Sequence, residues 1–266
     1  MITTDAVWSN VQRVRDATPL VHNITNYVVM NTTANALLAV GASPVMAHAR
    51  EEVADMVELA GALVINVGTL EPAWVEAMGI AMRRADEREI PVVLDPVGAG
   101  ATPYRTDATH DLLETAAPSV IRGNASEILA LATADARTRG VDSADAADDA
   151  LEAAAALHHK YGSTVAVTGE TDYVVGERTV RLTGGHPLMG RVTGTGCTAT
   201  ALCAAFTAVD GSTSQATTAA LAAFGAAGAV AGERAEGPGT MQVHLYDALY
   251  GLTRDQIERH VMVEDM

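Results

Sequence analysis

The sequence predicts an α/β fold built on a mostly parallel sheet. Short apolar runs alternate with longer segments in which apolar residues recur at helical spacing. This alternation is typical of strand–helix–strand units, in which each helix crosses back over the sheet. The 266 residues and the hydrophobic content of 48% suffice for one large core, so we expect a single domain spanning residues 1–266.

Each predicted strand is bounded by Gly, Pro or Asn, as expected for strands that are buried on both faces. In chain order the strands are Pro44–Ala47, Ala62–Val67, Pro91–Asp95, Ser119–Arg122 and Thr164–Thr168. The helical patterns include Val28–Val40, Glu51–Ala60, Ala73–Glu89 and Ala144–Tyr161.

The second half of the chain departs from this alternation. Tyr173–Leu182 predicts an antiparallel hairpin that turns at Gly176-Glu177-Arg178. Thr133–Ala150 is rich in Asp, Ala and Arg and is expected to be an exposed loop that leads into a helix. From Thr195 onward the chain is mostly helical and Ala-rich, which favours close helix packing or a subunit interface.

Composition excludes several classes of partner. The net charge is −16, so no basic surface is available for nucleic acid or for an acidic membrane. Cys197 and Cys203 are six residues apart without a CxxC pattern, which indicates neither a disulfide framework nor a zinc site and favours the cytosol. The N-terminus carries Asp5 and has no apolar signal core, so no targeting segment is expected. The apolar run Ala219–Gly232 is shorter than the ~20 residues that span a bilayer, so no membrane-spanning segment is expected.

The strongest candidate site is Gly194-Thr195-Gly196-Cys197, which opens a helix of small residues. This arrangement directs several backbone N–H groups and the positive end of a helix at one point, where an anion or a transferred phosphoryl group would be stabilised. The alternative is a helix cap with glycines for a tight turn. A dinucleotide fingerprint through Ala199 lacks the preceding strand and the acid about 20 residues later. The single lysine, Lys160, is in no P-loop context.

Further candidates follow the predicted strands, because ligands bind at the carboxyl ends of strands in open parallel sheets. Asp95 would be costly to bury unless it is paired or holds a metal ion; the alternative is a satisfied turn cap. Arg122 would contact phosphate or form a surface ion pair. Glu127, three residues after Asn124, would hold Mg²⁺ or complete an N-terminal capping box, and both roles are compatible.

Other polar positions carry less information. Asn26 would cap a helix or bind a heteroaromatic ring. We expect His22 to be structural, Met46 to be a core residue more often than a ligand contact, and His158-His159 to lie on the surface.

Six short motifs carry a resemblance to a known family. They are His22-Asn23-Ile24-Thr25-Asn26, Gly41-Ala42-Ser43-Pro44-Val45-Met46, Asp95-Pro96-Val97-Gly98, Arg122-Gly123-Asn124-Ala125-Ser126-Glu127, Val167-Thr168-Gly169 and Thr193-Gly194-Thr195-Gly196-Cys197. In this order, from about Pro19 to Ala208, the chain resembles the hydroxyethylthiazole kinases, ribokinase-fold enzymes of thiamine salvage.

The resemblance implies a ribokinase-like three-layer αβα domain with a mostly parallel central sheet and a late antiparallel hairpin. It implies ATP-dependent phosphorylation of the hydroxyl of 4-methyl-5-(2-hydroxyethyl)thiazole with Mg²⁺. It also implies a cytoplasmic homotrimer with thiazole pockets at the subunit interfaces. A pocket shared by two chains would explain why Asn26 and Met46 are far from Gly194 in sequence.

The resemblance also assigns roles to residues. It implies that Met46, Gly194 and Asn26 contact the thiazole, that Arg122 and Thr168 bind the ATP phosphates, and that Asp95 and Glu127 organise Mg²⁺ and its water. The anion hole Gly194, Thr195, Gly196 and Cys197 would be catalytic.

Cys197 stands where the wider superfamily has an Asp as general base. A thiol near helix-terminal amides is expected to have a lowered pKa, yet a thiolate is a modest base toward an alcohol. We therefore expect Cys197 to orient the hydroxyl or to accept its proton late, without being indispensable.

Three alternatives remain at this point. One is a kinase of the same fold for another small alcohol, such as a hydroxymethylpyrimidine. Another is a non-catalytic nucleotide sensor, which Asp95, Glu127 and the anion hole argue against. A dinucleotide-dependent oxidoreductase is disfavoured by the missing acid and strand.

Overall fold

The computed structural model describes residues 2–134 and 146–266, and in this part of the chain nine strands form one sheet. Their order is β2-β1-β3-β4-β5-β6-β7-β8-β9. The pairs from β2 to β6 are parallel and those from β6 to β9 are antiparallel. The strands are β1 (Leu20–Ile24), β2 (Ser43–Val45), β3 (Ala62–Asn66), β4 (Val92–Asp95), β5 (Val120–Asn124), β6 (Thr164–Thr168), β7 (Thr171–Val175), β8 (Thr179–Thr183) and β9 (Met262–Asp265).

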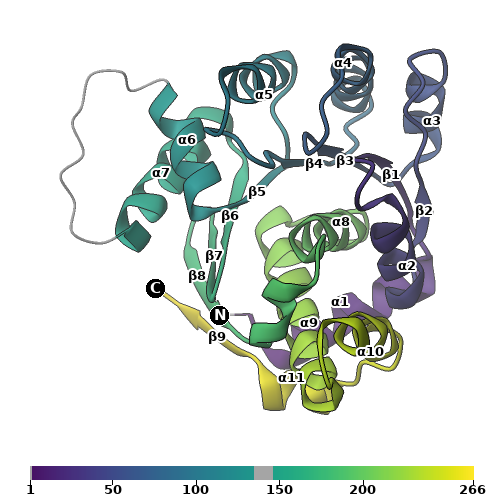
Figure 1. Cartoon of the computed structure of the whole chain (residues 1–266), viewed down its shortest axis with the longest axis vertical. Coiled ribbons are helices and arrows are strands. Elements are labelled where there is room, and N and C mark those ends of the chain that lie inside the picture. Colours follow the sequence, from purple (N-terminus) through teal and green to yellow (C-terminus); the bar gives the residue numbers. More distant parts are fainter. Residues whose placement is uncertain (1, 135–145) are drawn as a thin grey trace.

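Helices cover both faces of the sheet and give a three-layer fold (Figure 1). One outer layer contains α3 (Val53–Leu59), α4 (Pro72–Glu87), α5 (Pro103–Thr115), α6 (Ala125–Ala134) and α7 (Ala146–Tyr161). The other contains α1 (Thr4–Ala17), α2 (Met30–Val40), α8 (Thr195–Thr207), α9 (Thr213–Arg234), α10 (Pro238–Tyr250) and α11 (Arg254–His260). A separate hydrophobic cluster fills the space on each face of the sheet.

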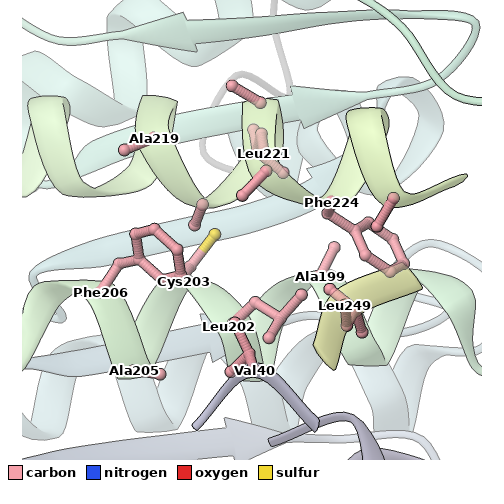
Figure 2. Packing of buried hydrophobic residues seen from close by; sticks show 14 of the residues in the cluster. Val40, Ala199, Leu202, Cys203, Ala205, Phe206, Ala219, Leu221, Phe224 and Leu249 are labelled. Carbon is pink, nitrogen blue, oxygen red and sulfur yellow. The ribbon is translucent and has the colours of Figure 1, made fainter. Parts of the chain in front are cut away.

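The helix α8 lies in the middle of its layer, between the sheet and α9. Small side chains let the two helices approach closely, and Figure 2 shows Cys203 and Phe206 of α8 on the side that faces α9, the helix that carries Ala219 and Leu221. Residues Thr198–Thr207 of α8 are all buried. The first turn of α8 is therefore held in place by the core behind it.

The predicted strands and helices are observed, with ends that differ by one or two residues for most of them. The hairpin prediction is confirmed by β7 and β8, which flank the turn at Gly176–Arg178. The segment 135–145, which contains most of the predicted loop and the predicted start of the helix Ala144–Tyr161, lies outside the described residues. Within the described part, no helix combines the length and hydropathy needed to cross a bilayer.

Strand β1 is the main difference from the prediction. No strand was predicted around His22–Asn26, but His22 and Asn23 lie inside β1 and are fully buried. The helices α1 and α5 and the edge strand β9 were also not predicted. Polar residues in a buried strand break the apolar run by which such a strand is recognised.

Candidate active site

The predicted site residues converge on the edge of the sheet where the parallel strands end. Asp95 ends β4, Arg122 lies in β5, Thr168 ends β6, and Asn26 follows β1 by two residues. The N-terminus of α8 arrives at this edge, and its Thr200 contacts Asp95.

Asp95 is the centre of a buried polar network. Its side chain is fully buried, and its Oδ2 accepts hydrogen bonds from Asn66 Nδ2 and Thr200 Oγ1, each at 2.8 Å. Arg122 Nη1 lies 3.8 Å from the same oxygen, whereas Oδ1 has no hydrogen-bond partner among residues 2–134 and 146–266. Burial raises the pKa of Asp95 to about 6, and the charge of Arg122 opposes this rise.

Asn66 links this carboxylate to Cys197. Its Oδ1 accepts from Asn26 Nδ2 at 2.8 Å, and Asn26 Nδ2 lies 3.6 Å from Cys197 Sγ. This path lies within one chain, so Asn26 comes beside Cys197 without the help of a second subunit. The amide of Asn26 is held between an acceptor oxygen and a sulfur.

The expectation that the pKa of Cys197 is lowered is wrong. Burial, and next the negative charge of Asp95, raise the pKa of Cys197 to about 11. Hydrogen bonds from the nearby amides and the charge of Arg122 act in the other direction but do not prevail. The positive end of helix α8 does not lower the pKa of Cys197, because the thiol is largely removed from water and faces a carboxylate. Cys197 is therefore a thiol at neutral pH.

Arg122 is positioned by its neighbours on three sides. It is only 8% exposed, donates through Nη2 to Thr168 Oγ1 and faces Asp95. A Cβ at Gly196 would come within 2.8 Å of Arg122 Nη1, so the absence of a side chain there lets the guanidinium reach the first turn of α8. Its Nε is buried and has no hydrogen-bond partner in the described part of the chain. Arg122 is therefore a buried, pre-oriented cation beside the helix N-terminus.

Gly194 is the residue that sets the entry into α8. It caps the helix with a φ of +82°, a region that favours glycine, and a Cβ there would lie 2.8 Å from Val29 Cγ1. The hydroxyl of Thr195 donates to the carbonyls of Met189 and Val192 at 3.2 and 3.3 Å, and so ties the first helical residue to the preceding segment. This geometry leaves the first amides of α8 directed at the sheet edge, as an anion hole requires.

Glu127 forms the capping box that was one of its two predicted roles. Its Oε2 accepts from Asn124 N at 2.8 Å, and Asn124 Oδ1 accepts from Glu127 N at 2.9 Å. Its Oε1 accepts from Gly98 N at 2.8 Å, which joins the loop after β4 to α6. Each carboxylate oxygen keeps a second lone pair, so a role toward a hydrated cation remains compatible with the cap.

Met46 lies apart from these contacts. It follows β2, the neighbour of β1 at the same sheet edge, and is half-buried. The loop is held by two histidines: His22 Nε2 donates to Ala47 O at 2.8 Å, and His48 Nδ1 lies 3.1 Å from Met46 O. The structural interpretation of His22 is thus confirmed.

A cavity of about 740 Å³ opens beside Arg122. Arg122, Thr168 and Gly196 line it together with Leu221 and Phe224 of α9. The cavity therefore joins a cation and helix amides to an apolar surface, which suits a ligand with an anionic part and a flat apolar part. Asp172 also lines it, and burial raises the pKa of that carboxyl.

No three His, Cys, Asp or Glu side chains within residues 2–134 and 146–266 form a cluster that could hold a metal ion by protein ligands alone. The unpartnered Asp95 Oδ1 is a buried acceptor that fits a hydrated Mg²⁺, which prefers oxygen ligands and keeps several waters. Asn66 stands at a strand end, where ligand contacts were expected, but no role was assigned to it from the sequence. Thr200 was not singled out, and its position one helical turn after Gly196 would have been the signal.

Comparisons with known proteins agree with this geometry. The Hydroxyethylthiazole kinase family matches residues 11–255. A hydroxyethylthiazole kinase of Syntrophus aciditrophicus is 54% identical over 264 residues, which cover 98% of both chains. The solved structure of a hydroxyethylthiazole kinase from Pyrococcus horikoshii OT3 superposes with a TM-score of 0.92 at 46% identity, covering 98% of this chain and 99% of that one.

A more distant structure shows the fold alone. A ribokinase-like superfamily protein of Enterococcus faecalis has a TM-score of 0.63 at 15% identity, covering 93% of this chain and 94% of that one. The three-layer fold with a mostly parallel sheet and late antiparallel strands is thus of the ribokinase-like type.

Proposed function

The chain belongs to the hydroxyethylthiazole kinase family and phosphorylates the hydroxyl of 4-methyl-5-(2-hydroxyethyl)thiazole in thiamine salvage, and we propose that it does so with ATP and Mg²⁺ at the α8 N-terminus. The observation that carries the proposed site is the meeting of buried Arg122 and Asp95 with the first turn of α8 beside a 740 Å³ cavity.

The anion hole would act on the transferred phosphoryl group. The thiazole hydroxyl oxygen forms the new bond to the γ-phosphorus, the bond to the bridging oxygen breaks, and ADP leaves. The amides of Gly194–Cys197 and the guanidinium of Arg122 would stabilise the charge on the phosphoryl oxygens. Because Thr168 orients the guanidinium and Gly196 leaves room for it beside the helix, little reorganisation is needed at the moment of transfer.

Mg²⁺ would be shared between the protein and the phosphates. Asp95, through its unpartnered Oδ1, and Glu127, through water, are the residues that would organise the ion. The ion would neutralise charge on the β- and γ-phosphates. The buried position of Asp95 also favours a partner of positive charge, since burial has raised its pKa to about 6.

The proton of the substrate hydroxyl is not taken by a preformed thiolate in this scheme. Cys197, a thiol hydrogen-bonded by Asn26, would orient the hydroxyl. In a loose, metaphosphate-like transition state the alcohol loses its proton late, and the proton passes to an oxygen of the new phosphate ester or to water, so a strong base is not required.

The thiazole would lie against Asn26, Gly194 and Met46, and we propose a homotrimer whose interfaces complete this pocket. The support is exposed apolar surface beside Asn26: Tyr27 is 53% exposed and Val28 61%. We place the enzyme in the cytoplasm, because its two cysteines are free thiols, a state that a reducing compartment maintains.

A coupled assay of ADP release tests the proposal. The thiazole alcohol and a hydroxymethylpyrimidine are compared as acceptors, with and without EDTA, and sedimentation measures the oligomer. We expect turnover of the thiazole only, loss of turnover on chelation with recovery on adding Mg²⁺, and a trimer. Equal rates with the pyrimidine, or activity unaffected by chelation, would contradict the proposal.

A further inference from the structure

Three glycines lie on one face of α9. Gly225, Gly228 and Gly232 follow the spacing i, i+3, i+7, which places them along a single stripe of the helix. Glycine is the least favourable residue in a helix interior after proline, whereas the rest of α9 is rich in alanine, the most favourable. Glycine at these positions therefore calls for a packing reason.

The segment 184–191 provides that reason. Gly185 N donates to Gly225 O at 3.0 Å, which fixes the segment against the helix. A Cβ at Gly228 would overlap the thioether of Met189, with Cε at 2.9 Å. A Cβ at Gly232 would overlap the imidazole of His186, with its Cβ at 2.6 Å. Two side chains of the segment thus rest directly on the helix backbone.

The segment 184–191 also lines the cavity beside Arg122, in which the ATP of the proposed function would lie. His186 and Met189 both line it, together with Arg122 and Thr168 of the sheet edge. His186 Nδ1 accepts from Leu188 N at 3.2 Å, so the ring proton is on Nε2 and the ring is fixed in orientation.

The same segment reaches the anion hole. Met189 O accepts from Thr195 Oγ1 at 3.2 Å, and Thr195 is the first residue of α8. A displacement of Met189 would therefore change both the width of the cavity and the support of the helix N-terminus that faces the phosphates.

We propose that Gly228 and Gly232 are positioning residues for the nucleotide. Because these glycines lack a side chain, Met189 and His186 can lie directly against the backbone of α9. The cavity is then wide enough for a nucleoside triphosphate whose phosphates face the N-terminus of α8. The inference rests on the proposed function, in that the cavity takes the nucleotide. It goes beyond that function in assigning the fit to residues of α9.

Substitution of the two glycines tests the proposal. Gly228→Ala and Gly232→Ala are expected to raise KM for ATP by about tenfold or more, with KM for the thiazole within about twofold of its original value. Gly79→Ala is the matched control, because Gly79 is a buried glycine within α4 whose added Cβ would meet only Arg83 Nη1 at 3.6 Å. Unchanged KM for ATP in both α9 variants would overturn the proposal.

Shortening the displaced side chain supplies a second comparison. In a Met189→Ala background the space above Gly228 is open, so adding Gly228→Ala is expected to cost little further. The two substitutions should be strongly non-additive in KM for ATP, and additivity would refute the role of Met189. This comparison also serves if Gly228→Ala alone fails to fold.

Calorimetric titration with a non-hydrolysable ATP analogue separates the two levels of inference. If the unsubstituted enzyme does not bind the analogue, the proposed function fails. If the unsubstituted enzyme and both glycine variants bind it equally, only the positioning role fails.

Discussion

Replacing Cys197 with serine is expected to leave kcat within about tenfold of its original value, because in the proposed function Cys197 orients the substrate hydroxyl and does not act as the base. Its thiol is buried beside Asp95, and this environment raises its pKa to about 11. Serine keeps a hydroxyl where the sulfur lies 3.6 Å from Asn26 Nδ2, so the polar contact can persist.

The expected loss of kcat in the serine variant depends on whether Cys197 acts as a base or as an orienting group. With a pKa of about 11, about one molecule in a thousand is ionised at pH 8. Loss of a general base typically costs about 10²–10⁴ in rate, whereas loss of an orienting contact costs about tenfold, or about 1.4 kcal/mol. The two roles therefore differ by at least an order of magnitude in the serine variant.

Two measurements decide between them. The first is kcat of the original, Cys197→Ser and Cys197→Asp enzymes from pH 6 to 10. The second is the pH dependence of iodoacetamide alkylation, which reports the pKa of the thiol directly. A loss of more than about 100-fold in the serine variant, together with an alkylation pKa below 8, would refute the reasoning.

Three further predictions concern the surrounding network. Thr200→Val removes a donor from buried Asp95, so the free energy of unfolding in urea should fall by about 1.5–3 kcal/mol; equal destabilisation by Thr200→Ser, which keeps the donor, would contradict this. Arg122→Lys keeps the charge but loses the planar fork that Thr168 orients, so KM for ATP should rise about tenfold, and an unchanged KM would count against the site. Burial lowers the pKa of His22, so the stability it contributes is present above its unfolded pKa of 6.5 and is lost as the pH falls through its folded pKa. Unfolding at pH 7.5 and 5.5 should show a smaller acid loss in His22→Gln, and an equal loss would disprove the link.

The central strands could be predicted because their residues are uniformly apolar. The strand 164–168 matches β6, and those at 62–67 and 91–95 differ from β3 and β4 by one residue at one end. Strand β1 could not be predicted in this way, because it buries His22 and Asn23. Their partners, Ala47 O and Val21 O, make this burial tolerable, and the bond to Ala47 depends on the pairing of β1 with β2.

The candidate site was predicted where it depends on strand ends. Asp95 ends β4 and Thr168 ends β6, and Arg122 lies in β5 between these two strands. The order of the strands alone therefore brings the three residues near each other. The contribution of Thr200 depends instead on where α8 crosses β4, which local patterns do not specify. The lowered pKa expected for Cys197 took account of the helix N-terminus but not of the burial of the thiol. The sign of the predicted pKa change was therefore wrong.

The alanine packing between α8 and α9 has a consequence for how this protein tolerates mutation. Most protein cores are destabilised chiefly when a side chain is truncated. Alanine has almost nothing to lose, so the losses at a buried alanine such as Ala219 come from larger side chains instead. A single added methylene must force two backbones apart, and one of them carries the first turn of α8. A saturation scan should therefore show its harshest positions among the smallest residues, far from any ligand.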